Sequence, residues 1–133
     1  MIVNYNWLQE WADIKSKPEE LPELLAKIGI EVEETEKIPG DTIYKIDITP
    51  NRGDLLSVIG IAREIAAKTG KKLKKRMEYK FPNGNKKEEI NVTVQSAEDC
   101  PRYTASPIYS IKIERSPSFI IERLEKCGIR PLN

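Results

Sequence analysis

The chain has 133 residues, of which 39% are hydrophobic and 32% charged, a balance that excludes wholesale disorder and fits one ordinary domain or two small ones. No apolar run approaches the roughly 18 residues of a membrane span, and the N-terminus has no signal-like stretch, so we expect a cytoplasmic protein with no membrane partner. The net charge of +1 is uneven: residues 1–40 carry nine Asp/Glu and four Lys (−5), and residues 41–133 carry twelve Asp/Glu and eighteen Lys/Arg (+6). Such asymmetry is compatible with a basic surface that faces nucleic acid or an acidic partner, and equally with a solvated face.

A short helix is predicted near the N-terminus, over residues 6–13. Trp7, Leu8 and Trp11 are spaced so that their side chains meet one turn apart on one side of such a helix. We therefore interpret the two tryptophans as anchors of the core.

A second helix is predicted to follow and to end at Gly29, because glycine readily takes the left-handed conformation that ends helices. Ser16 and Glu19 resemble a capping box at its start. Pro22 lacks the backbone N–H that a helix interior uses, which favours a start beyond Ser16.

A β-hairpin is predicted after this helix. Ile30 and Val32 alternate with glutamates, as in a strand with one buried face, and residues 42–48 alternate in the same way. The turn signal at residues 39–41, Pro-Gly-Asp, lies between the two runs.

A polar connection links the hairpin to the strongest predicted helix, which runs to about residue 69: Pro50, Asn51, Arg52, Gly53 and Asp54. We interpret it as a structural motif in which Arg52 pairs with a nearby acid, Gly53 takes an unusual, positive backbone angle and Asp54 caps the helix. The alternative is a phosphate site made by Arg52 and the helix start. An acid at the helix start would repel an anion, which favours the structural interpretation.

A basic segment follows the helix and supplies the candidates for contact with RNA: Lys71, Lys72, Lys74, Lys75 and Arg76. Clustered cations neutralise backbone phosphates, and the nearby Tyr79 and Phe81 could stack on a base. The alternative is a solvated linker in a lysine-rich chain.

The last part of the chain predicts two strands and a helix. Residues 90–94 alternate, residues 102–113 form a second extended run, and Ser116-Pro117 begins a helix that Gly128 ends. The fold expected is therefore α+β, with short helices packed on a small, mostly antiparallel sheet, followed by a second, small strand–strand–helix part. We place the first domain at residues 1–76, a basic linker at 77–87 and an incomplete second domain at 88–133.

The residues that enzymes use most often are missing. The chain has no histidine and neither a GxxxxGK[ST] nor a GxGxxG loop, so a histidine-dependent triad and those phosphate cradles are excluded. Cys100 and Cys127 lack zinc-site spacing and are interpreted as reduced, packed thiols. We expect no catalytic residue, no metal site and no cofactor in this chain.

Five segments together carry a resemblance to a known family: YNWLQEW, ELLAKIGIEVEE, DITPNRGDLLSVIGIAREIAA, CPRY and RLEKCGIRPLN. In order and character they resemble the β subunit of bacterial phenylalanyl-tRNA synthetase, nearly from end to end. The third segment, residues 47–67, is the most specific, and CPRY alone would be weak.

Two departures from that family bear on function. The family normally carries a tRNA-binding oligonucleotide-fold domain inserted in the hairpin, whereas here only Ile38-Pro39-Gly40-Asp41 joins the strands. The sequence also stops at GIRPLN, where the family continues into its editing, catalytic-like and anticodon-binding domains. The resemblance thus implies the N-terminal, non-catalytic part of the β subunit.

The resemblance also implies partners and cofactors. These are the synthetase α subunit, which performs the reaction, and the rest of the β subunit, with ATP and Mg²⁺ used by the whole enzyme that joins phenylalanine to its tRNA. Contact of this chain with tRNA is expected to be weak. A freestanding RNA-binding module derived from the subunit is the alternative, and a small enzyme finds no support.

Overall fold

The computed structural model describes residues 1–74 and 90–132. These residues fall into two compact units, one formed by residues 1–74 together with 116–132 and the other by residues 90–115. The last helix of the chain therefore groups with the N-terminal residues, whereas we expected it in the second part, residues 88–133.

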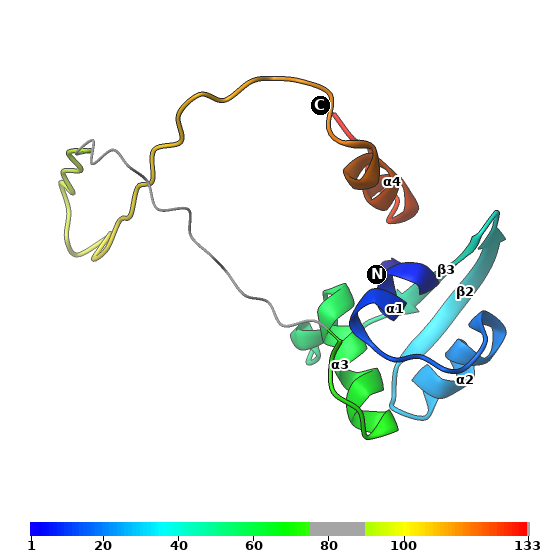
Figure 1. Ribbon diagram of the computed structural model, residues 1–133. Coiled ribbons are helices and arrows are strands. Elements are labelled where there is room, and N and C mark those ends of the chain that lie inside the picture. Colours follow the sequence, from blue (N-terminus) through cyan, green and yellow to red (C-terminus); the bar gives the residue numbers. More distant parts are fainter. Residues whose placement is uncertain (75–89, 133) are drawn as a thin grey trace. The chain divides into compact units, whose positions relative to one another are not determined.

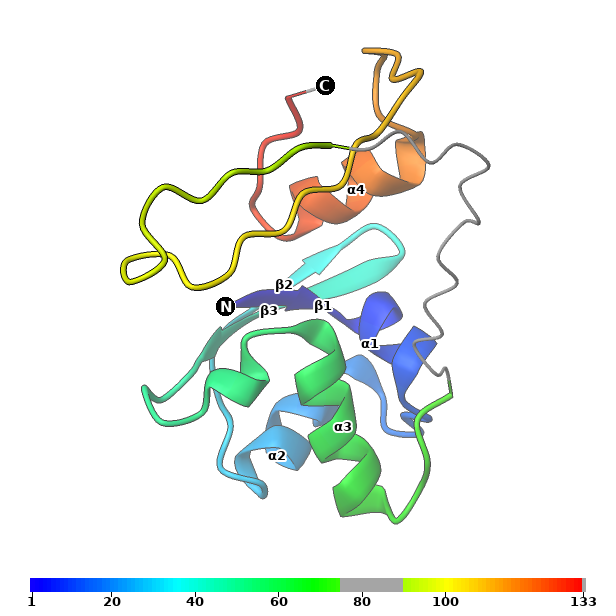
Figure 2. The same cartoon turned by 90° about the vertical axis from the view of Figure 1, so that its left-hand side faces the viewer.

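The first unit combines a three-stranded sheet with short helices and two 3₁₀ turns (Figure 1). In chain order the elements are β1 (Ile2–Asn4), α1 (Tyr5–Trp11), η1 (Pro18–Glu20), α2 (Leu21–Ala26), β2 (Glu31–Ile38), β3 (Asp41–Asp47), η2 (Gly53–Leu55), α3 (Val58–Thr69) and α4 (Ser118–Lys126). The strand order is β1-β3-β2 and both pairings are antiparallel, so the predicted α+β class is confirmed. Figure 2 shows α2 and α3 on one side of the sheet and α4 on the other.

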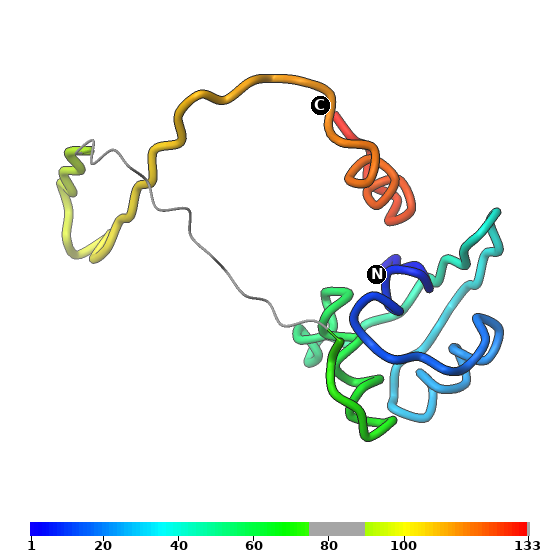
Figure 3. The backbone as a smooth tube through the Cα atoms, in the orientation of Figure 1, coloured from blue at the N-terminus to red at the C-terminus, as the bar shows by residue number. Residues whose placement is uncertain are grey.

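The predicted hairpin is confirmed. β2 and β3 run side by side to a two-residue turn, Pro39-Gly40, where Ile38 pairs with Asp41 (Figure 3). Gly40 has a φ of 75°, in the left-handed region that glycine adopts without steric cost. A β-bulge between Val32 and Glu34 shifts the register of the pair.

The third strand, β1, was not predicted. Its three residues pair with β3, and Val3 lies opposite Tyr44. A run of three apolar residues at the N-terminus is too short to show a period, so its strand character depends on the neighbouring strand.

The core lies between the sheet and the first three helices. Its fully buried members come from β1, α1, α2, β3, η2, α3 and the residue just before β2, and the largest are Tyr44, Leu8, Leu21, Leu25, Ile30, Ile46, Leu55, Ile61, Ile65 and Val3. Leu8 is the buried anchor of α1, whereas Trp7 and Trp11 are only partly buried and pack against the rim of the core. The tryptophans thus cover the core without forming its centre.

The predicted capping box is wrong by one residue. The Glu20 carboxylate accepts a hydrogen bond of 2.9 Å from the backbone N–H of Lys17, and η1 begins at Pro18. Proline is pre-organised for the first helical position, so it fixes the start there instead of after Ser16. Pro22 then falls in the first turn of α2, where its missing N–H costs little. Gly29 ends the helix with a φ of 76°, as predicted.

The second unit contains neither of the two predicted strands among its described residues. Residues 90–115 contain no helix or strand, residues 97–99 form a turn, and the apolar side chains of Ile90, Val92 and Val94 are exposed. A strand requires a neighbour for its backbone N–H and C=O groups, and alternation in sequence does not supply one. The predicted helix is present as α4, which ends before Gly128 with a φ of 72° at that glycine.

Candidate interaction site

The described part of the basic segment lies against α1. The Lys71 ammonium forms an ion pair with Asp13, the backbone N–H of Lys74 donates to the Trp11 carbonyl over 2.8 Å, and the Lys74 ammonium donates to the Gln9 carbonyl over 2.8 Å. The hydrogen bond from Lys71 is the main reason why the pKa of Asp13 is lowered.

Two of the three described RNA-contact candidates therefore have partners within the protein. Lys72 is exposed, and Lys75 and Arg76 lie outside the described residues. Leu73, between the lysines, packs on the rim of the core. This arrangement anchors the start of the segment to α1 and leaves less of its charge available for an RNA backbone.

The connection at residues 50–54 brings Arg52 and Asp54 together. The Arg52 guanidinium donates to both carboxylate oxygens of Asp54, over 3.0 and 2.9 Å, and lies 3.2 Å from a carboxylate oxygen of Glu64. These contacts raise the pKa of Arg52, and the hydrogen bonds from Arg52 lower that of Asp54. The expected local pairing of Arg52 is confirmed. Because the guanidinium is already paired with two carboxylates, it is less available to bind a phosphate.

Two details of that connection were predicted wrongly. Ser57, not Asp54, caps α3, since its hydroxyl oxygen accepts from the backbone N–H of Gly60 over 3.0 Å. Gly53 does not have a positive φ. Asp54 lies one turn upstream in η2, so its carboxylate pairs with Arg52 instead.

The glycine that the local packing requires is Gly60. A Cβ atom there would overlap the carbonyl oxygen of Asp54. No local sequence pattern predicts this, because the contact is between the backbone of η2 and the first turn of α3.

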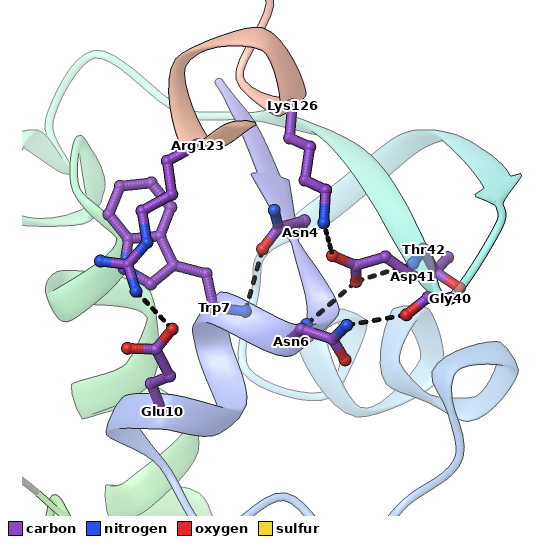
Figure 4. A network of polar contacts seen from close by, with 9 residues as sticks. All are labelled: Asn4, Asn6, Trp7, Glu10, Gly40, Asp41, Thr42, Arg123 and Lys126. Atoms are coloured by element: carbon purple, nitrogen blue, oxygen red, sulfur yellow. Dashed lines mark hydrogen bonds and ion pairs between the residues drawn. The ribbon is translucent and has the colours of Figure 1, made fainter. Parts of the chain in front are cut away.

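A polar network joins α4 to the hairpin turn and to α1 (Figure 4). The Asp41 side chain is fully buried, and its carboxylate accepts from the Lys126 ammonium over 2.9 Å and from the backbone N–H groups of Thr42 and Asn6 over 2.9 and 3.1 Å. Asn6 also donates from its side chain to the Gly40 carbonyl over 2.8 Å. One carboxylate thereby connects three segments that are distant in sequence.

A second contact lies beside the first. The Arg123 guanidinium donates to the Glu10 carboxylate over 2.5 Å and stands over the Trp7 ring, 5.1 Å from its centroid. Trp7 is in turn placed by Asn4, whose side-chain oxygen accepts from the Trp7 backbone N–H over 2.9 Å and caps α1. The partly buried tryptophan thus has a polar neighbour on its outer face.

Sequence reasoning missed this network. Asn4 directly precedes α1 and could have been identified as an N-cap, but Asp41 was assigned to a turn, and no local pattern links it to Lys126.

Neither a metal site nor a membrane helix occurs in the described part of the chain. No group of three or more Cys, Asp or Glu side chains there could hold a metal ion. None of its helices is long and apolar enough to cross a membrane.

Comparison with known proteins identifies relatives of the chain. The family model of the Phe-tRNA synthetase beta subunit B1 domain matches residues 1–71. A phenylalanine–tRNA ligase beta subunit from Rhodopirellula baltica is 38% identical over 134 positions, which cover 100% of this chain and 20% of the relative. The corresponding subunits of Carboxydothermus hydrogenoformans and Geobacter sulfurreducens are 41% and 46% identical over 81% and 70% of the chain, and the aligned parts make up 13% and 12% of those proteins. The chain thus spans a fifth or less of the length of these relatives.

The Rhodopirellula alignment also bears on the hairpin turn. Its 134 positions against the 133 residues of this chain leave room for about one extra residue in the relative. That subunit therefore has no domain inserted between the strands that correspond to β2 and β3. The short turn, the five sequence segments and the match to residues 1–71 agree, and the chain belongs to the family of the phenylalanyl-tRNA synthetase β subunit B1 domain.

Proposed function

We propose that this chain acts as the non-catalytic N-terminal part of a phenylalanyl-tRNA synthetase β subunit and supports assembly of the enzyme that attaches phenylalanine to tRNA in translation. The observation that carries the proposal is the match of the B1 family to residues 1–71, extended to the whole chain by the Rhodopirellula subunit. In this proposal the partners are the synthetase α subunit and the rest of the β subunit, in the cytoplasm. ATP and Mg²⁺ are used by the assembled enzyme and are assigned to no residue of this chain.

The second candidate, a freestanding RNA-binding module, is favoured by the basic segment alone. Lys71 and Lys74 are held by Asp13 and the Gln9 carbonyl, which weakens that candidate. The first forty residues also carry −5, which opposes the approach of a polyanion.

A salt titration of tRNA binding separates the two candidates. If the segment 71–76 neutralised about five phosphates, the logarithm of the affinity would fall with the logarithm of salt concentration with a slope of about −3.5 to −4.5. The matched variant changes all five candidate cations to serine: Lys71, Lys72, Lys74, Lys75 and Arg76. We expect weak, non-selective binding by both proteins that vanishes near physiological salt. Tight binding by the parent at physiological salt, lost in the variant, would instead establish the RNA-binding module.

A further inference from the structure

The helix α4 has nine residues, fewer than the roughly 12–15 at which an isolated helix becomes even marginally stable in water. It lies beyond residue 71, where the family match ends, yet it contacts β1 and groups with the N-terminal unit. Its helical state therefore depends on what it packs against.

The surface that holds α4 is built around a buried charge. The Asp41 side chain is fully buried, and Lys126 supplies the cation that compensates its carboxylate. The Lys126 side chain itself is 31% exposed, so the pair is only partly buried, and loss of the cation leaves the buried carboxylate with its backbone donors alone, which is unfavourable. The backbone N–H groups of Thr42 and Asn6 complete the coordination of the carboxylate and fix its position.

Two further contacts close the same surface. Arg123 lies between the Glu10 carboxylate and the face of the Trp7 ring, a geometry that combines an ion pair with a cation–π contact. Gly128, just past the end of α4, lies so close to β1 that a Cβ atom there would be 3.1 Å from Cδ1 of Ile2. The α4 segment therefore contacts the N-terminal residues through an ion pair, a cation–π contact and a close approach of its backbone.

We propose that the hairpin turn and α1 form a docking surface whose occupant is the α4 segment, residues 116–132, and that Asp41 is its anchor. The short turn between β2 and β3 then has a role of its own: it carries the carboxylate that fixes the returning chain on the B1 domain. The proposal rests on contacts within this chain and does not depend on the proposed function.

Cys127 provides a built-in probe of docking. It follows α4 directly, is partly buried, and lines an apolar groove with Ile2 and Trp7. Burial also raises the pKa of its thiol, which further slows reaction with a disulfide reagent. In the full chain with Cys100→Ser, the rate of labelling of Cys127 relative to the same chain in urea reports how often α4 leaves its site.

The first variant is Lys126→Glu, which places a second carboxylate against Asp41. We expect labelling of Cys127 to accelerate at least about tenfold, while the thermal transition of the N-terminal core is retained. The matched control is Arg130→Glu, the same loss of positive charge at an exposed residue, which should leave the rate unchanged. Labelling of Lys126→Glu at the parental rate would overturn the proposal. If that variant loses its thermal transition, Lys126→Met provides the same test without the added repulsion.

An exchange of charges tests the second contact. Arg123→Glu alone should accelerate labelling, and Glu10→Arg combined with Arg123→Glu should return it toward the parental rate, because the pair is restored in the opposite sense. A double variant as fast as Arg123→Glu would show that Glu10 does not hold α4.

Discussion

Gly60 lies where the first turn of α3 passes closest to η2. A methyl group at this residue would overlap the carbonyl oxygen of Asp54, which is backbone and cannot move aside without shifting η2. Overpacking of this kind typically costs about 1–3 kcal/mol, so Gly60→Ala should lower the free energy of unfolding by at least about 1 kcal/mol. Urea denaturation followed by circular dichroism measures the change.

Gly53 is the control for that substitution. A Cβ atom at Gly53 would meet nothing within 4 Å, and its φ is not positive. Gly53→Ala should therefore be neutral or stabilise the fold by up to about 1 kcal/mol through the unfolded chain. Equal losses in the two variants would contradict the assignment of the close contact to Gly60.

For single residues, the sequence predicted which charges pair locally better than it predicted contacts between residues distant in the chain. Arg52 was expected to pair with a nearby acid, and its guanidinium donates to both carboxylate oxygens of Asp54, the residue expected to cap the helix. Which glycine is indispensable could not be predicted, because the contact at Gly60 depends on the path of η2 and not on the residues next to it. The same is true of Asp41, whose cation comes from the other end of the chain.

Among the elements, β3 and η1 are joined by the Tyr44 hydroxyl. Tyr44 is fully buried and donates to the Pro18 carbonyl over 2.8 Å. Tyr44→Phe removes the donor and leaves that carbonyl without this partner, so the free energy of unfolding should fall by about 1 kcal/mol at neutral pH. Tyr103→Phe, at a residue that is 65% exposed, is the control and should have no effect.

Tyr44 also makes the fold sensitive to alkali. Burial raises its pKa above the ordinary value of 10.0, which means that the folded state favours the neutral hydroxyl. A raised folded-state pKa contributes stability that is complete below about pH 10 and is lost as the pH rises toward the folded-state value. The stability of the parent should therefore decline above pH 10 more steeply than that of Tyr44→Phe. Parallel pH profiles would contradict this role of the hydroxyl.

Helices and the hairpin were predicted correctly where the residues that end them or form the turn lie next to them in the sequence. Pro39-Gly40 between two alternating runs predicted the hairpin, and Gly29 and Gly128 predicted the ends of two helices. β1 was missed because three residues carry no period, and residues 90–94 alternate without pairing to any neighbour in the described chain. In both cases the outcome depends on a partner strand, which a local pattern does not contain.

For the whole molecule, we expect that the chain alone does not activate phenylalanine. Formation of phenylalanyl-adenylate requires groups that bind ATP, and the sequence contains neither of the common phosphate-binding loops and no histidine. The purified chain should show no phenylalanine-dependent exchange of pyrophosphate into ATP. Exchange above that of a buffer control, retained through purification, would be incompatible with a non-catalytic role.

We propose that this chain serves as the N-terminal part of a synthetase β subunit. The most direct test of this role is a graft in which these 133 residues replace the aligned part of the Rhodopirellula baltica beta subunit, which matches the chain over its whole length. The measurement is phenylalanylation of tRNA after co-expression with the synthetase α subunit, beside a subunit from which the same part is deleted. We predict that the graft assembles with the α subunit and restores activity that the deletion lacks. A graft as inactive and unassembled as the deletion would contradict this role of the chain.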